Sequence, residues 1–358
     1  MVEGVFTIFN VVRIFSMAMM AFFVVLAITP LWTKILYKYR LGKGVVRHDN
    51  APIFSELHKK KVGTPTMGGV VIWATVIILT VGFWAFSRLY PDTNIGSINF
   101  LSRGQTWVPF AAFIVAAMLG LVDDILGVFR IGPGGGGLRM RDRLVMYALV
   151  GAGGAWWFYT KLGWDFINVP FLGDLTLGWI YIPFFIFIII ASAFSANETD
   201  GLDGLVAGVF LIMFGAYAVI AFDQGRMDLV VLLAAIMGAL IAFLWFNIYP
   251  ARFFMGDTGS MSLGVTLGVV AMLTNTPFLL IPIAFIFIIE SGSVLLQLIS
   301  KKVRGKKIFL STPIHHHFEA LGWHETQVTM RFWMISAVGA IIGLIIFLVD
   351  SKLPPFFR

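Results

Sequence analysis

Apolar runs long enough to cross a lipid bilayer recur along this chain of 358 residues. A helix that crosses the hydrocarbon core needs about 20 apolar residues. We expect ten such spans, at about 14–34, 67–87, 107–128, 144–161, 178–196, 205–222, 228–247, 259–275, 278–300 and 331–349. Only 13% of the residues are charged, about half the share found in soluble domains, so a water-soluble fold is excluded. The sequence therefore predicts an all-α polytopic membrane protein, with residues 1–358 forming a single integral membrane domain.

The segments between the spans are mostly short, which favours a compact helical bundle. One of them, residues 162–177, has turn signals at Val169-Pro170 and Gly173-Asp174, so we expect a small β-hairpin there. Cysteine is absent, which excludes disulfides and thiolate metal sites. The first apolar run is too long for a signal-peptide core and is interpreted as a retained span.

Basic residues predict the orientation of the bundle. With ten spans, the segments after spans 1, 3, 5, 7 and 9 lie on one side and hold eight, four, none, one and six Lys and Arg residues. These are 19 of the 26 in the chain. Because positive loops stay in the cytoplasm, this side is expected to be cytoplasmic, with both termini and the hairpin on the opposite side.

Acidic residues collect in the same loops. Asp123-Asp124 closes the third span, where two carboxylates repel each other and oppose the helix dipole. A divalent cation or a proton-transfer role explains such a pair, and a solvated helix end is the structural alternative. In TDGLDGL, Asp200 and Asp203 lie three residues apart, and Asp257 lies between two glycines in MGDTGS. Helix capping is the competing explanation for these three aspartates.

Histidine and lysine complete the polar set of this face. His315, His316 and His317 follow the ninth span between apolar neighbours, and a phosphate contact suits them better than ligation of a hard metal ion. Lys61 ends a lysine run before GTPTMGG, where glycine-rich backbone can cradle phosphate. Glu290, within the ninth span, is expected to face a groove or a partner. Carboxylates for Mg²⁺ together with cations are what phosphoryl transfer requires.

The motifs resemble those of the phospho-N-acetylmuramoyl-pentapeptide transferase family. The resemblance rests on GTPTMGG, VDD, TDGLDGL, FNIYPARFFMGDTGS and PIHHHFEALGW followed by RFW, and runs from about residue 40 to 335. It implies transfer of phospho-MurNAc-pentapeptide from its UDP carrier to undecaprenyl phosphate in peptidoglycan synthesis. Mg²⁺ is the implied cofactor and the bacterial cytoplasmic (inner) membrane the implied location, with the site facing the cytoplasm. Membrane lipid is an expected partner, nucleic acid is not, and a homodimer is one assembly compatible with the resemblance.

The resemblance also assigns roles by position. Asp257 is expected to be the main Mg²⁺ ligand, with Asp123 as a second, and Asp123 to act on the lipid phosphate, either covalently or by activating it for direct displacement. Catalytic roles are likewise implied for Asp124, His315, His316 and His317. Uracil is expected to stack on Phe254 and to bond near Asp203. The substrate-binding residues implied are Lys61, Thr66, Asn197, Asp200, Gly201, Leu202, Asp203, Asn247, Phe254, Ser260 and Gln297.

Three positions depart from the family pattern. Phe194 replaces an asparagine, Glu198 replaces an apolar residue, and Gly136 stands where a lysine commonly precedes Gly-Leu. Compensation for the missing lysine is a hypothesis with three candidates, Arg130, Arg141 and Arg143.

Two other functions are compatible with parts of this pattern. A polyprenyl-phosphate GlcNAc-1-phosphate transferase shares the aspartate motifs, but the PIHHHFE segment resembles the muramoyl-pentapeptide branch more closely. A transporter keeps its essential polar residues near the membrane midplane, whereas here they gather at one end and only Glu290 lies clearly inside a span.

Overall fold

The computed structural model describes residues 8–42, 61, 63–91, 98–102, 104–133 and 136–352. Lys59, Lys60, Gly134 and Gly135, which belong to the lysine and glycine runs noted above, lie outside the described residues. The long helices are α1 (Ile8–Lys38), α3 (Val70–Leu89), α4 (Trp107–Val128), α5 (Met140–Lys161), α6 (Tyr181–Thr199), α7 (Leu205–Asp223), α8 (Met227–Asn247), α9 (Asp257–Leu273), α11 (Phe285–Arg304) and α13 (Glu325–Lys352). The shorter ones are η4 (Gly178–Ile180), η5 (Pro277–Leu279), α10 (Leu280–Ile283) and α12 (Ile314–Ala320).

The predicted class is confirmed, but the count of ten spans is not. Among the described residues, seven helices are long and apolar enough to cross a membrane, or eight if the bent pair of α10 and α11 forms one span. All ten predicted segments are helical. However, α9 has only 17 residues, and α5 carries Arg141, Asp142 and Arg143 in its first turn.

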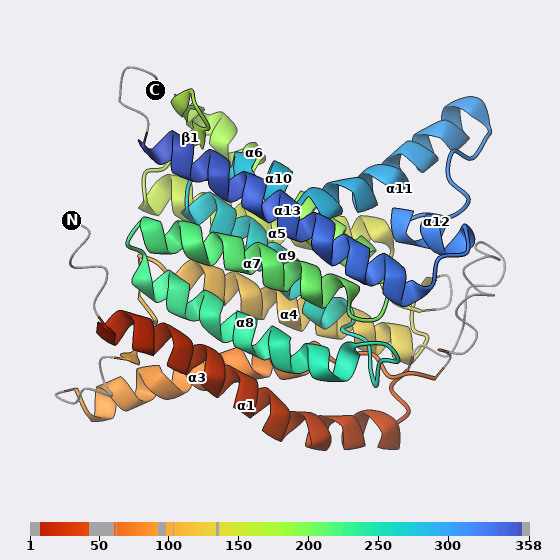
Figure 1. Ribbon diagram of the computed structural model, residues 1–358, viewed down its shortest axis with the longest axis horizontal. Coiled ribbons are helices and arrows are strands. Elements are labelled where there is room, and N and C mark those ends of the chain that lie inside the picture. The colour runs from red at the N-terminus through yellow and green to blue at the C-terminus, as the bar shows by residue number, and fades with distance from the viewer. Residues whose placement is uncertain are drawn as a thin grey trace.

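The ninth predicted span is broken. Its two parts, Pro277–Ile283 and Phe285–Arg304, meet at an angle of 84°. The break follows Pro282, which has no backbone N–H to donate. As a result, α11 leaves the bundle and projects away from the other helices (Figure 1).

The core of the bundle surrounds α9. Every residue of this helix is buried, and it packs chiefly against α4 and α6. Glycine permits this approach: a Cβ on Gly120 of α4 would collide with the backbone of Asp257, and one on Gly264 would lie 2.7 Å from the Cβ of Ala196. The first turn of α9 therefore lies directly beside the end of α4.

The predicted hairpin is confirmed. Strands β1 (Phe166–Val169) and β2 (Gly173–Thr176) pair antiparallel, with Val169 opposite Gly173. The start of α1 and the end of α13 lie at the end of the bundle opposite α12 (Figure 1).

Candidate functional site

The aspartate pair at the end of α4 meets the first turn of α9, and the two aspartates do different things. Asp124 accepts hydrogen bonds from the backbone N–H of Thr258 (3.0 Å) and from the hydroxyl of Thr66 (3.3 Å). It thus supplies the N-terminal cap of α9, because the helix makes no side-chain cap of its own. The capping alternative raised for Asp257 is therefore not supported; that carboxylate points elsewhere.

Asp123 and Asp257 meet at one guanidinium. Nε of Arg143 lies 2.6 Å from Oδ2 of Asp123, and Nη2 lies 3.4 Å from Oδ2 of Asp257. Nη1 donates to Oδ1 of Asn197 at 3.0 Å, and the amide of Asn197 donates in turn to Oδ1 of Asp257. Residues from α4, α5, α6 and α9 therefore share one buried polar cluster, the acid–arginine cluster of Asp123, Arg143, Asn197 and Asp257.

The structure distinguishes among the three candidate arginines. Arg143 lies in the acid–arginine cluster with a side chain only 17% exposed. By contrast, the Arg141 side chain is 85% exposed and its charge is 4.0 Å from Asp142, while Arg130 is exposed. Of the three candidates, Arg143 is the one whose guanidinium contacts Asp123 and Asp257.

Gly136 and Gly137, the described glycines of the run, bring the loop back to Asp123. Gly137 has a φ of +83°, and the next backbone N–H, that of Leu138, donates to Oδ1 of Asp123 at 2.6 Å. A side chain at 137 would be strained by this backbone conformation, so the glycine allows the chain to return to the carboxylate.

The oxygen ligands of the acid–arginine cluster fit Mg²⁺. Mg²⁺ is commonly held by one or two protein carboxylates with substrate phosphates and water, and Asp123 and Asp257 provide two carboxylates beside the amide oxygen of Asn197. No group of three or more His, Cys, Asp or Glu suited to a metal occurs among the described residues. Two carboxylates match the protein ligands that Mg²⁺ takes when substrate phosphates and water supply the others.

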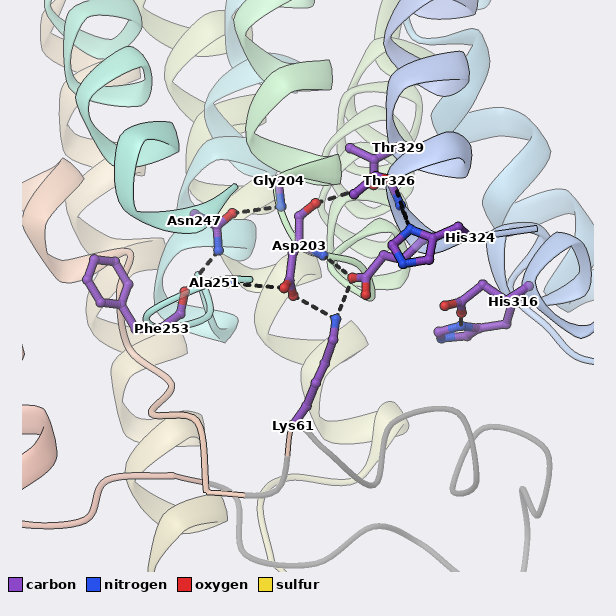
Figure 2. A network of polar contacts seen from close by, with 12 residues as sticks. Lys61, Asp203, Gly204, Asn247, Ala251, Phe253, His316, His324, Thr326 and Thr329 are labelled. Carbon is purple, nitrogen blue, oxygen red and sulfur yellow. Dashed lines mark hydrogen bonds and ion pairs between the residues drawn. The ribbon is translucent and has the colours of Figure 1, made fainter. Parts of the chain in front are cut away.

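A second cluster forms at the predicted nucleotide end. Lys61 pairs with Asp203 (2.7 Å) and with Glu325, and its ammonium lies 5.7 Å from the ring centroid of Phe254. Figure 2 shows Lys61 extending toward Asp203 from below the network. The other oxygen of Asp203 accepts from the N–H of Ala251 at 2.9 Å. The structure thus brings Lys61 to Asp203 and Phe254, the two residues that the resemblance assigns to the uracil.

The histidine triplet is helical rather than part of a loop. In α12, Nδ1 of His315 lies 2.9 Å from Glu290, and Nδ1 of His316 lies 2.7 Å from Glu319. His317 differs, since its Nδ1 accepts from the N–H of Leu310 at 3.2 Å. The expectation that Glu290 faces a partner is confirmed.

His315 and His316 both pack on the TDG turn after α6. A Cβ on Gly201 would collide with Nε2 of His315 and would lie 3.2 Å from Nε2 of His316. Glycine is therefore required at 201. The preceding residue, Asp200, accepts through its carboxylate from the N–H of Gly256 at 3.1 Å. The TDG turn therefore contacts both the histidines of α12 and Gly256, the residue before Asp257.

Several predicted binding residues have side chains that bond to backbone groups around the site. Asn247 bonds to the N–H of Gly204 (3.1 Å) and to the carbonyl of Phe253 (2.9 Å), as Figure 2 shows. Gln297 makes three bonds to the backbone of Ile308 and Phe309. Ser260 donates to the carbonyl of Gly256 (3.1 Å) and accepts from Asn197 (3.4 Å), and Leu202 is buried.

Sequence reasoning missed Glu319 and Glu325. Glu325 accepts both from Lys61 and from the N–H of Asp203 (2.7 Å), although Lys61 lies 264 positions away in the chain. No local signal reveals such a pairing. Glu319, by contrast, stands three residues after His316, a spacing at which helical neighbours meet.

Comparison with known proteins identifies the family. A family model described as glycosyl transferase family 4 matches residues 106–275, and signature 1 of the phospho-N-acetylmuramoyl-pentapeptide-transferases matches residues 61–72. Relatives carrying that transferase name include one from Geobacillus sp. (strain WCH70), 34% identical over 91% of this chain and 95% of its own length. One from Listeria welshimeri is 37% identical (90% and 95%), and one from Clostridium novyi is 36% identical (91% and 94%). The chain belongs to the phospho-N-acetylmuramoyl-pentapeptide transferase family.

Proposed function

We propose that this enzyme transfers phospho-MurNAc-pentapeptide from UDP-MurNAc-pentapeptide to undecaprenyl phosphate, giving lipid I and UMP. An oxygen of the lipid phosphate attacks the phosphorus that carries the sugar, and the bond from that phosphorus to the UMP oxygen breaks. The observation that carries the proposal is the convergence of Asp123 and Asp257 on Arg143, in a chain of this family. It supplies oxygen ligands and a cation at one point, as phosphoryl transfer requires.

Asp123 and Asp257 would hold Mg²⁺, with Asn197 beside them. Bound Mg²⁺ would neutralise charge on the pyrophosphate of the donor. Arg143 supplies a second positive charge: as substrate phosphates enter, its guanidinium can exchange a carboxylate contact for a phosphate oxygen. Such charge-assisted, preorganised donors stabilise a transition state without reorganisation.

The nucleotide is proposed to bind at the cluster of Lys61, Asp203 and Phe254. The half-buried ring of Phe254 is the proposed stacking surface. Asp203, held by Lys61 and the N–H of Ala251, is the proposed acceptor for a uracil N–H. The pyrophosphate is proposed to contact the imidazoles of His315 and His316, which pack on Gly201, two residues before Asp203.

The polyprenyl chain is proposed to occupy the apolar cavity beside the helix break. This cavity has a volume of about 250 Å³ and is lined by Phe184, Phe187, Phe278 and Phe287, among others. It extends to Ser195, two residues before Asn197, so a chain lying there would present its phosphate toward the acid–arginine cluster.

The active site is proposed to face the cytoplasm of the bacterial inner membrane, where nucleotide-sugars are available. The excess of Lys and Arg in the loops of this side supports the orientation. A homodimer remains a proposal that sedimentation in detergent would test.

One assay separates the proposed substrate from its alternative. Purified protein with undecaprenyl phosphate and Mg²⁺ receives either UDP-MurNAc-pentapeptide or UDP-GlcNAc, and UMP and the lipid product are measured. We expect turnover of the first donor only. Turnover of UDP-GlcNAc alone would assign the chain to the GlcNAc-1-phosphate branch instead.

A further inference from the structure

The tip of α11 carries a dense cluster of basic residues. Five of the seven positions from 301 to 307 are Lys or Arg, all five are exposed, and no Asp or Glu occurs between residues 291 and 318. We call these residues, Lys301, Lys302, Arg304, Lys306 and Lys307, the basic tip. A cluster of four to eight basic residues next to a membrane helix is typical of binding to anionic lipid headgroups.

The basic tip belongs to an ordered turn. Gly305 ends α11 in the left-handed conformation (φ +64°), and the hydroxyl of Ser300 donates to the carbonyl of Lys306 at 2.9 Å. Gln297 then holds Ile308 and Phe309 by their backbone groups. The charges are therefore displayed on a fixed turn, which reduces the entropic cost of binding a charged surface.

Exposed apolar side chains lie on α11 next to the basic tip. Leu295, Leu298, Ile299 and Val303 are each more than half exposed, and Val303 is 75% exposed. Because α11 projects away from the bundle (Figure 1), no described helix covers these side chains. A soluble polyanion would leave them in water, whereas a phospholipid covers them with its acyl chains and the cations with its phosphate.

We propose that the basic tip binds the headgroups of anionic phospholipids. This contact would fix the position of α11 and α12 relative to the membrane surface. The connection to α12 is short: the N–H of Leu310 bonds to His317 (3.2 Å), and the rings of Phe309 and His317 lie 5.6 Å apart. Lipid composition would then influence the histidines of α12. This last consequence rests on the proposed function, while the lipid contact does not.

A lipid-quenching experiment tests the contact directly. Because the chain has no cysteine, Ile308→Cys gives a single labelling site; its side chain is half exposed, and only its backbone bonds to Gln297. The labelled full-length protein is placed in nanodiscs of fixed phosphatidylglycerol and phosphatidylcholine content, in which either the first or the second lipid is brominated. Quenching then reports which lipid lies at the tip.

We expect phosphatidylglycerol to quench at least about fivefold more effectively than phosphatidylcholine, since each basic residue near an anionic surface contributes about that factor. Substitution of Lys301, Lys302 and Arg304 by Gln should reduce the preference below about twofold. Lys306→Gln with Lys307→Gln provides a second variant should the first fail to fold.

Lys34, Lys38 and Arg40, exposed at the end of α1, give a matched control with the same loss of charge. Their substitution by Gln should leave the preference unchanged. Equal quenching by both lipids, survival of the preference in the tip variants, or its equal loss in the control would each overturn the proposal.

An activity arm separates the lipid contact from its consequence. UMP release should increase with the phosphatidylglycerol fraction in the unsubstituted protein, and less so in the tip variant. If UMP release fails in every membrane, the proposed function is contradicted, and the quenching ratio still decides the fate of the lipid contact.

Discussion

Replacement of Arg143 by Ala removes the only cation described between Asp123 and Asp257. The side chains of these two aspartates are 0% and 6% exposed, and that of Arg143 is 17% exposed. Removal of one partner from a buried ion pair costs about 3–5 kcal/mol, and the partial exposure of Arg143 lowers the expectation to about 2–3 kcal/mol. If the same free energy is lost from the stabilisation of the transition state, kcat falls by about 30- to 150-fold.

The same substitution should strengthen the binding of divalent cations. A guanidinium close to Asp123 and Asp257 repels a second cation, by about 4 kcal/mol for unit charges 4 Å apart at an effective dielectric constant near 20. Movement of the side chain and water relieve part of this repulsion. We therefore expect Mn²⁺, titrated as a probe without substrate, to bind Arg143→Ala at least about tenfold more tightly.

Arg141→Ala provides the matched control, because this arginine lies two residues away with its side chain 85% exposed. Its kcat and Mn²⁺ affinity should stay within about twofold of the unsubstituted protein. The combination of a lower kcat with tighter metal binding identifies an electrostatic role for Arg143. A parallel loss of both, accompanied by a large decrease in Tm, would refute the reasoning, and so would equal effects at both arginines.

Other side chains give sharp tests of the same site. Gly201→Ala should lower activity at least about 100-fold, because its Cβ would collide with His315. The control Gly153→Ala, which has open space around it, should keep its activity within about twofold of the unsubstituted protein. Similar activities in the two variants would contradict the contact between Gly201 and His315. Glu290→Gln should lower kcat about 10- to 100-fold with little change in KM, because the bond that orients the imidazole of His315 is weakened. Partial recovery in Glu290→Asp is expected, and a change confined to Tm would exclude this orienting role. Lys61→Met should raise KM for the UDP-sugar at least about tenfold by releasing the carboxylates that it holds, and an unchanged KM would exclude it from the nucleotide end.

The sequence predicted the broad architecture because apolar length and turn residues are local signals. The helices and the hairpin at 162–177 appear as expected. The count of ten spans depended on treating each apolar run as a straight crossing. The 84° bend after Pro282 and the 17 residues of α9 show why run length alone does not determine the number of crossings.

Sequence also predicted which face carries the polar residues, but not how their bonds are distributed. Asp123 and Asp124 are adjacent, yet one meets Arg143 and the other caps α9. The difference arises from the approach of α4 to α9 at Gly120, a tertiary contact without a local signature. The backbone bonds of Asn247, to Gly204 and Phe253, likewise join segments distant in sequence from one another and could not be predicted locally.

The long-range acidic partners were the hardest to predict. Glu290 could be flagged because a carboxylate inside a span needs a partner, and the structure provides His315. Glu325 gave no such signal, since an acidic residue in the first turn of a helix is common. Only the folded chain brings it to Lys61.

The central claim is most directly tested by simultaneous measurement of UMP and lipid-linked product from the purified protein in proteoliposomes. With UDP-MurNAc-pentapeptide, undecaprenyl phosphate and Mg²⁺, the two products should appear in equal amounts, and Asp257→Asn should reduce both at least about 100-fold. Absence of both products from folded protein, or full activity in the Asp257 variant, would contradict the proposed transfer at the acid–arginine cluster.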